Sequence, residues 1–74
     1  MDYCQWGGEY LALAERMKEH LKPLKAELKT LRGEDQLLLF RRVAMMNQMR
    51  LECLRTGREL VERGKQYAEH AAQS

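Results

Sequence analysis

The side chains that could ligate a metal or act as nucleophiles are few in this sequence. They are two cysteines and two histidines: Cys4, Cys53, His20 and His70. None of them occurs in a CxxC, HxxxH or HExxH spacing, which would bring metal ligands together. The adjacent Gly7 and Gly8 do not follow a β-strand, so they do not indicate a phosphate-binding loop. We therefore predict that the protein is not an enzyme and has no catalytic residue, no metal site and no cofactor.

A stripe of basic residues is the second feature with chemical potential. Its members repeat at spacings of four and three residues: Lys18, Lys22, Lys25, Lys29 and Arg32. On a helix this spacing places them on one face, where they could follow the phosphates of a nucleic acid. Nearby Glu15, Glu19 and Glu27 weaken the field, and the lysine stems could equally lie along an apolar seam with their charges in water. Nucleic-acid binding is therefore an alternative and not the main prediction.

Composition indicates that helices carry these side chains. The 74-residue chain is 45% hydrophobic and 32% charged, which is typical neither of a disordered nor of a membrane-spanning protein. Leucine occurs 12 times, isoleucine is absent, and four residues are β-branched. Such a composition favours helix and excludes an all-β or α/β fold. We expect an all-α protein with a single domain.

Charge and cysteine content suggest where such a domain works. Thirteen basic and eleven acidic side chains give a net charge of +2, which by itself does not indicate a nucleic-acid partner. The apolar run 37–40 stops at Arg41, far short of the roughly 20 residues that a membrane span needs. Two cysteines without a signal-peptide pattern predict a reducing compartment, so we expect a cytoplasmic protein with no transmembrane segment.

Residues that favour helix ends predict that the chain forms a helical hairpin. Gly33 can end one helix in the left-handed conformation, and Asp35 can cap the next. We predict a first helix over about 3–32, a turn over about 33–35 and a second helix over about 36–72. The first helix should continue through Pro23 with a kink. Its beginning is open: Asp2 can cap a helix that starts early, or the helix can start near Glu9 after the two glycines.

Two apolar seams with alternating spacings of four and three residues predict how the helices pair. Folding the chain at the turn brings together residues whose numbers sum to 67. The pairs that contain glycine are Tyr10 with Gly57, Tyr3 with Gly64, and Gly7 with Leu60. Each glycine would then face a large side chain, which fills the seam. For Trp6 and Tyr3 two interpretations are open: they close the open end against Tyr67, or they form a contact site. The rival to one long second helix is a break at Gly57 with a third helix beyond it.

The second helix carries an apolar stripe that is wider than one partner helix can cover. We therefore predict self-association, most simply as a dimer that forms a four-helix bundle. The predicted interface comprises Phe40, Val43, Met46, Leu54, Leu37, Leu51 and Arg50. Further partner contacts are predicted at Met45, Met49, Lys18, Lys22, Lys25 and Lys29. Arg50 lies on the seam, and it should reach water or an acid of another subunit.

These features favour a small non-catalytic protein that acts by protein–protein association, as an adaptor or regulator. A different class is also open, because the segment 37–58 contains five arginines and one glutamate among leucines and methionines. A basic amphipathic helix of this kind can bind an anionic membrane surface. That alternative predicts little folded stability without vesicles.

Overall fold

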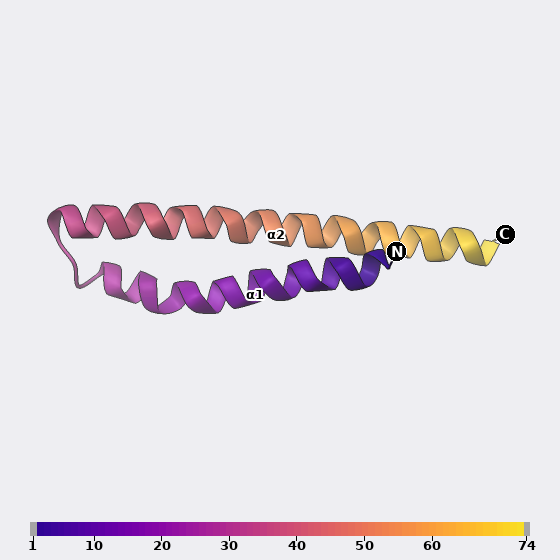
Figure 1. Cartoon of the computed structure of the whole chain (residues 1–74), viewed down its shortest axis with the longest axis horizontal. Coiled ribbons are helices and arrows are strands. Elements are labelled where there is room, and N and C mark those ends of the chain that lie inside the picture. The colour runs from indigo at the N-terminus through magenta and orange to yellow at the C-terminus, as the bar shows by residue number, and fades with distance from the viewer. Residues whose placement is uncertain (1, 74) are drawn as a thin grey trace.

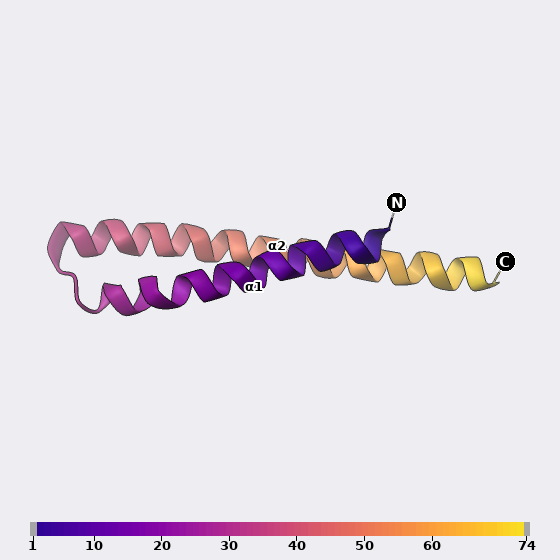
Figure 2. The same cartoon turned by 60° about the horizontal axis from the view of Figure 1, so that its bottom comes forward.

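The computed structural model describes residues 2–73, which form two helices joined by a short turn (Figure 1). Helix α1 spans Tyr3–Leu28 and helix α2 spans Gly33–Gln73. The helices run antiparallel and side by side in both views, and α2 continues past the beginning of α1 (Figures 1 and 2). The molecule is a rod with extents of 62 × 15 × 15 Å. The predicted all-α hairpin is confirmed.

The beginning of α1 is set by Asp2. Its side chain accepts a hydrogen bond from the backbone N–H of Gln5 at 3.1 Å, and its carbonyl accepts one from Trp6 at 3.0 Å. These bonds satisfy amide groups that have no partner within the helix. Of the two predicted beginnings, the early one is therefore correct. The helix also continues through Pro23 without a break.

The turn differs from the prediction by a few residues. α1 ends at Leu28 because the N–H groups of Lys29 and Thr30 bond back three residues, to Ala26 and Glu27, in a tighter turn. The Gln36 side chain then caps the Leu28 carbonyl at 3.1 Å. Gly33 has φ = 67°, in the left-handed region predicted for it. α2 already begins there, so Asp35 lies in the first turn of α2 and is not its cap.

The core is a thin seam between the two helices. Its buried hydrophobic residues in the described part of the chain are Ala14, Leu21, Val43 and Leu60. α2 passes through Gly57 as one continuous helix, so the alternative of a third helix is wrong. A single seam of this kind leaves most of the apolar residues of both helices at the surface.

The register of the seam is close to the prediction, but the packing at the glycines differs. A Cβ added at Gly64 would lie nearest to Cys4, 2.9 Å from its backbone nitrogen, and 3.3 Å from the Cβ of the predicted partner Tyr3. Gly7, however, lies nearest to Gly57 and Val61: an added Cβ would lie 2.6 Å from the Gly57 carbonyl oxygen. The helices therefore meet backbone to backbone at this point. Gly57 contacts Leu11, while Tyr10 turns aside towards Trp6.

The elongated shape exposes more surface than a compact protein of this mass. The Cα radius of gyration is 17.4 Å, against about 11 Å for a compact domain of this length. The accessible surface is 6054 Å², against about 4,700 Å² for a typical folded monomer of 8.7 kDa. The excess of about 1,300 Å² is surface that a single seam cannot cover.

Candidate association surface

One flank of α2 carries a stripe of mostly apolar residues. It consists of Leu37, Phe40, Ala44, Asn47, Leu51 and Leu54, and we call it the α2 stripe. Asn47 and Leu54 are half-buried, and the other four residues are exposed. Successive residues of the stripe are alternately three and four positions apart. They therefore form a second heptad seam beside the one that faces α1. Phe40 is 58% exposed although it is the largest side chain of the stripe. Exposed leucine and phenylalanine at heptad spacing are typical of a helix that packs against another helix.

The lysines of α1 lie on the same side of the rod as the α2 stripe. Near the open end, Leu11 of α1 lies against Gly57, and the Cys4 thiol lies 3.8 Å from the Val61 carbonyl. Lys18 and Lys25 follow Leu11 at intervals of seven residues. Going back from Val61 by sevens leads to three members of the stripe: Leu54, Asn47 and Phe40. Residues seven apart share a face, so an apolar stripe and a basic stripe run next to each other.

The basic stripe has few ion partners. Within the described residues, the single ion pair joins the Lys22 ammonium to Glu19 at 3.0 Å, and both side chains are more than half exposed. Exposed pairs of this kind contribute little stability. Lys18, Lys25 and Lys29 are exposed, and none of the three forms an ion pair within the described residues. Their charges are therefore available to other molecules.

Four residues of the predicted interface are wholly or partly covered within the hairpin itself. Val43 is only 7% exposed, because α1 covers it, so it does not belong to the free surface. Met46, Arg50 and Leu54 are half-buried. Arg50 finds its partner on its own helix: Nε and Nη2 donate to the Asn47 side-chain oxygen at 3.2 and 3.1 Å. The seam position of Arg50 indicated that it needs a partner, but not that an amide three residues away supplies it.

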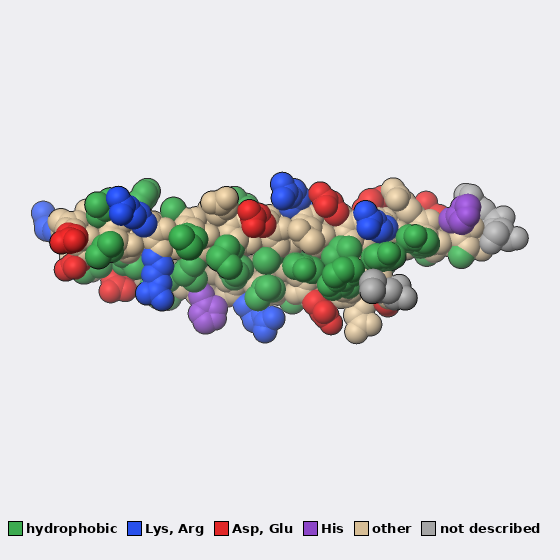
Figure 3. Space-filling model, turned by 45° about the horizontal axis from the view of Figure 1, so that its top comes forward, with side chains coloured by type: hydrophobic (Ala, Val, Ile, Leu, Met, Phe, Trp, Pro, Cys, Tyr) green, Lys and Arg blue, Asp and Glu red, His purple; other side chains and the backbone are tan. Residues whose placement is uncertain are grey.

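The opposite flank of α2 is also apolar. Leu38, Met45 and Met49 are exposed there, and Met45 is 66% exposed, the highest fraction among the exposed large hydrophobic residues. Hydrophobic side chains follow most of the length of the rod in Figure 3, between scattered charged groups. The methionines are interrupted by Arg42 and Glu52 at the intervening heptad positions, so this flank is less continuous than the α2 stripe.

Aromatic rings close the open end of the hairpin. Tyr3 stacks on Tyr67 with 5.4 Å between ring centroids, and Trp6 follows at 6.4 Å from Tyr3 and 6.3 Å from Tyr10. The Arg63 guanidinium lies 5.7 Å from the centre of the Tyr3 ring. The contact of Tyr3 and Trp6 with the Tyr67 end agrees with one of the two predicted interpretations. The positions of Tyr10 and Arg63 in this cluster were not predicted, because they depend on the small rotation that brings Leu11 onto Gly57.

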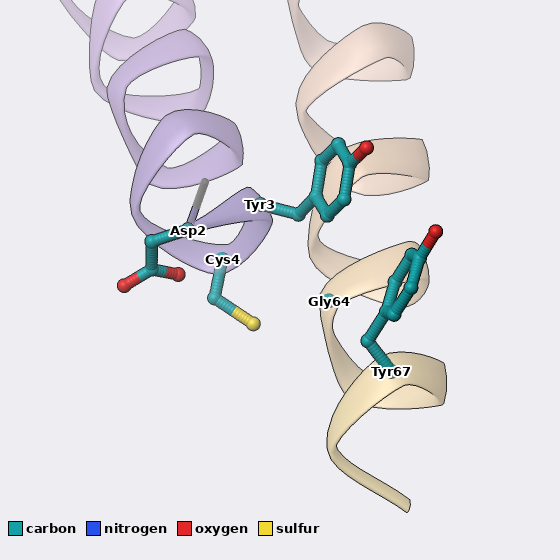
Figure 4. Close-up of a pocket in the computed structure, with 5 residues that line it drawn as sticks. All are labelled: Asp2, Tyr3, Cys4, Gly64 and Tyr67. Carbon is teal, nitrogen blue, oxygen red and sulfur yellow. The ribbon is translucent and has the colours of Figure 1, made fainter. Parts of the chain in front are cut away.

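A shallow crevice lies beside these rings at the N-terminal end of α1 (Figure 4). It is lined by Asp2, Tyr3, Cys4, Gly64 and Tyr67. The Asp2 carboxylate, which caps α1, points away from the two tyrosines in this view. The crevice is open to solvent, so it does not provide a water-excluding site for chemistry.

The stacked tyrosines should stabilise the open end. We expect Tyr67→Ala to lower the free energy of unfolding by about 1 kcal/mol, because it removes an aromatic pair. Tyr67→Phe keeps the ring and should change little. Urea unfolding followed by Trp6 fluorescence measures both variants. Equal stability of Tyr67→Ala and wild type would mean that the stack contributes nothing.

The described residues contain no group of three or more His, Cys, Asp or Glu side chains that could hold a metal ion. Cys4 and Cys53 are free thiols, exposed and half-buried respectively. Neither described helix has a stretch that is long and apolar enough to cross a bilayer.

Fold and surface together define a class: a two-helix antiparallel hairpin with an uncovered heptad stripe on its longer helix. No protein-family model matches this chain, and no match was found among curated proteins or solved structures.

Proposed function

We propose that the protein acts by protein–protein association, as a dimer of hairpins joined through the α2 stripe, and that it is a non-catalytic adaptor or regulator. One observation carries the proposal: Leu37, Phe40 and Leu51 are exposed at heptad spacing, while a single seam supplies the whole core. Its two free thiols suit a reducing compartment such as the cytoplasm.

The amount of uncovered surface supports a dimer. A stable interface of standard size buries about 800 Å² on each partner. The excess surface of the rod, about 1,300 Å² over a compact monomer, is sufficient for one such interface. The apolar members of the stripe would lie at its centre, where burial of Leu and Phe side chains contributes most.

Pairing the two α2 helices produces a four-helix assembly. It has an apolar contact between the α2 helices and a hydrated edge that carries the lysines of the α1 helices. The α2 helices meet along their stripes, and the lysine-bearing edges of the α1 helices lie next to each other. Lysines at such an edge can keep their charges in water while their stems cover apolar surface. The apolar contact between the α2 helices therefore provides the affinity.

The first test is the absolute mass in solution, measured by light scattering on a sizing column. The measurement should span a hundredfold range of concentration at low and high salt. We expect a mass near twice 8.7 kDa throughout. A folded monomer over the whole range would overturn the proposal. An unfolded monomer that becomes helical only with anionic vesicles would favour the membrane-surface alternative.

A second candidate function is the binding of nucleic acid, favoured by the exposed lysines of the basic stripe. Changing Lys18, Lys22, Lys25 and Lys29 to glutamine separates the two functions. The dimer should form at least as tightly in this variant, because the substitutions remove like charges from the hydrated edge where the two α1 helices lie next to each other. Any nucleic-acid affinity should be lost, together with its steep salt dependence. Loss of the dimer in the variant would instead place the lysines in the interface.

A further inference from the structure

We infer that the two hairpins pair antiparallel, with stripe residues in contact when their numbers sum to 91; this inference rests on the proposed dimer. The contacts are Leu37 with Leu54 of the second copy, Phe40 with Leu51 of the second copy, and Ala44 with Asn47 of the second copy. The two-fold axis then passes between positions 45 and 46. Every large apolar residue of the stripe meets another one.

The spacing of the stripe leaves few other antiparallel registers. Because the pattern repeats every seven residues, the register can shift only by seven without moving the stripe out of contact. A sum of 98 places Phe40 against Arg58 of the second copy. A sum of 84 places Leu51 and Leu54 opposite the turn, at Gly33 and Thr30. Only the sum of 91 covers all the large apolar residues.

Charges along the stripe favour the antiparallel orientation. The edge of the stripe that faces away from α1 carries Glu34, Arg41, Gln48 and Arg55, seven residues apart. In the proposed register Glu34 lies next to Arg55 of the second copy, and Arg41 lies next to Gln48 of the second copy. Symmetry makes two oppositely charged pairs and no like-charged pair on this edge. A parallel dimer would place Glu34 beside its own copy and align the dipoles of two 41-residue helices.

The single polar residue of the stripe can be covered without loss of its hydrogen bonds. Asn47 faces the small Ala44 of the second copy, close to the two-fold axis. Its side-chain oxygen already accepts two hydrogen bonds from Arg50. A polar residue at one position of an apolar seam opposes shifted registers, because either shift would place Asn47 against a leucine.

Distances between spin labels test orientation and register together. Labels go singly on Leu38, Met45, Glu52 or Glu59, which share the face of α2 away from the stripe. The background is Cys4→Ala with Cys53→Ala, checked first for wild-type helix content and mass. At about 1.5 Å per residue, the axial offset between equal labels should be near zero at 45, about 20 Å at 38 and 52, and about 40 Å at 59.

Four equal distances would mean a parallel dimer, and a shortest distance at Glu52 would mean the register of 98. Either result overturns this inference and leaves the proposed dimer intact. Absence of any dipolar coupling in a monomeric protein would overturn both.

Charge reversal provides an independent test. Arg55→Glu or Glu34→Arg alone should weaken the dimer about tenfold, since each affects two exposed ion pairs. Combining the two changes should restore most of the affinity. Arg42→Glu, on the opposite flank, is the matched control and should have no effect. If the double variant is no tighter than the single ones, Glu34 does not meet Arg55 and the register is wrong.

Discussion

Gly7→Ala is expected to lower the free energy of unfolding by about 2 kcal/mol, although alanine favours helix more than glycine does. The reason is the close approach of the two helices. An added Cβ would lie 2.6 Å from the Gly57 carbonyl oxygen and 2.9 Å from the Val61 nitrogen. Backbone atoms cannot turn away as the end of a side chain can, so the helices have to separate. Circular dichroism during thermal and urea unfolding, at one fixed protein concentration, measures the loss.

The neighbouring glycine is a matched control. Apart from its own stretch of helix, a Cβ added at Gly8 would have no neighbouring atom within 4 Å. Gly8→Ala should therefore stabilise the protein by up to about 1 kcal/mol through helix propensity alone. The two variants differ by one position and should shift stability in opposite directions. Equal effects would show that α1 and α2 do not meet closely at Gly7.

Phe40→Glu is expected to weaken the dimer by at least about a hundredfold. The dimer contains the change twice, and each copy loses an apolar contact and brings a carboxylate into an apolar interface. The hairpin itself should stay folded, because Phe40 is 58% exposed and lies outside its core. Sedimentation or light scattering over a concentration series measures the dissociation constant, and circular dichroism confirms the fold.

Leu38→Glu is the control for this variant. Leu38 is 55% exposed, two residues before Phe40, and lies on the opposite flank of α2. The Leu38→Glu variant should therefore have the same dimeric mass as the wild type. If Leu38→Glu dissociates the dimer and Phe40→Glu does not, the interface is the flank of Met45 and Met49. If neither variant has an effect, α2 does not mediate association through either flank.

Local rules were sufficient to predict the two helices and the turn. The heptad spacing of the seams, the left-handed Gly33 and the Asp2 cap are all short-range features, and the structure contains each of them. The ends of the helices were less predictable. They depend on whether Lys29 and Thr30 bond back by three or four residues and on a side chain, Gln36, that caps Leu28 from the next helix.

The sequence by itself determined the helical class, the antiparallel pairing and the presence of more apolar surface than one seam can bury, because these follow from residue type and period. Only the tertiary structure decided which apolar residues remain exposed. Val43 and Phe40 are three apart and both apolar, yet one is covered by α1 and the other faces solvent. That difference depends on how closely the helices approach and how they are rotated about their axes, which residue type and period alone do not determine.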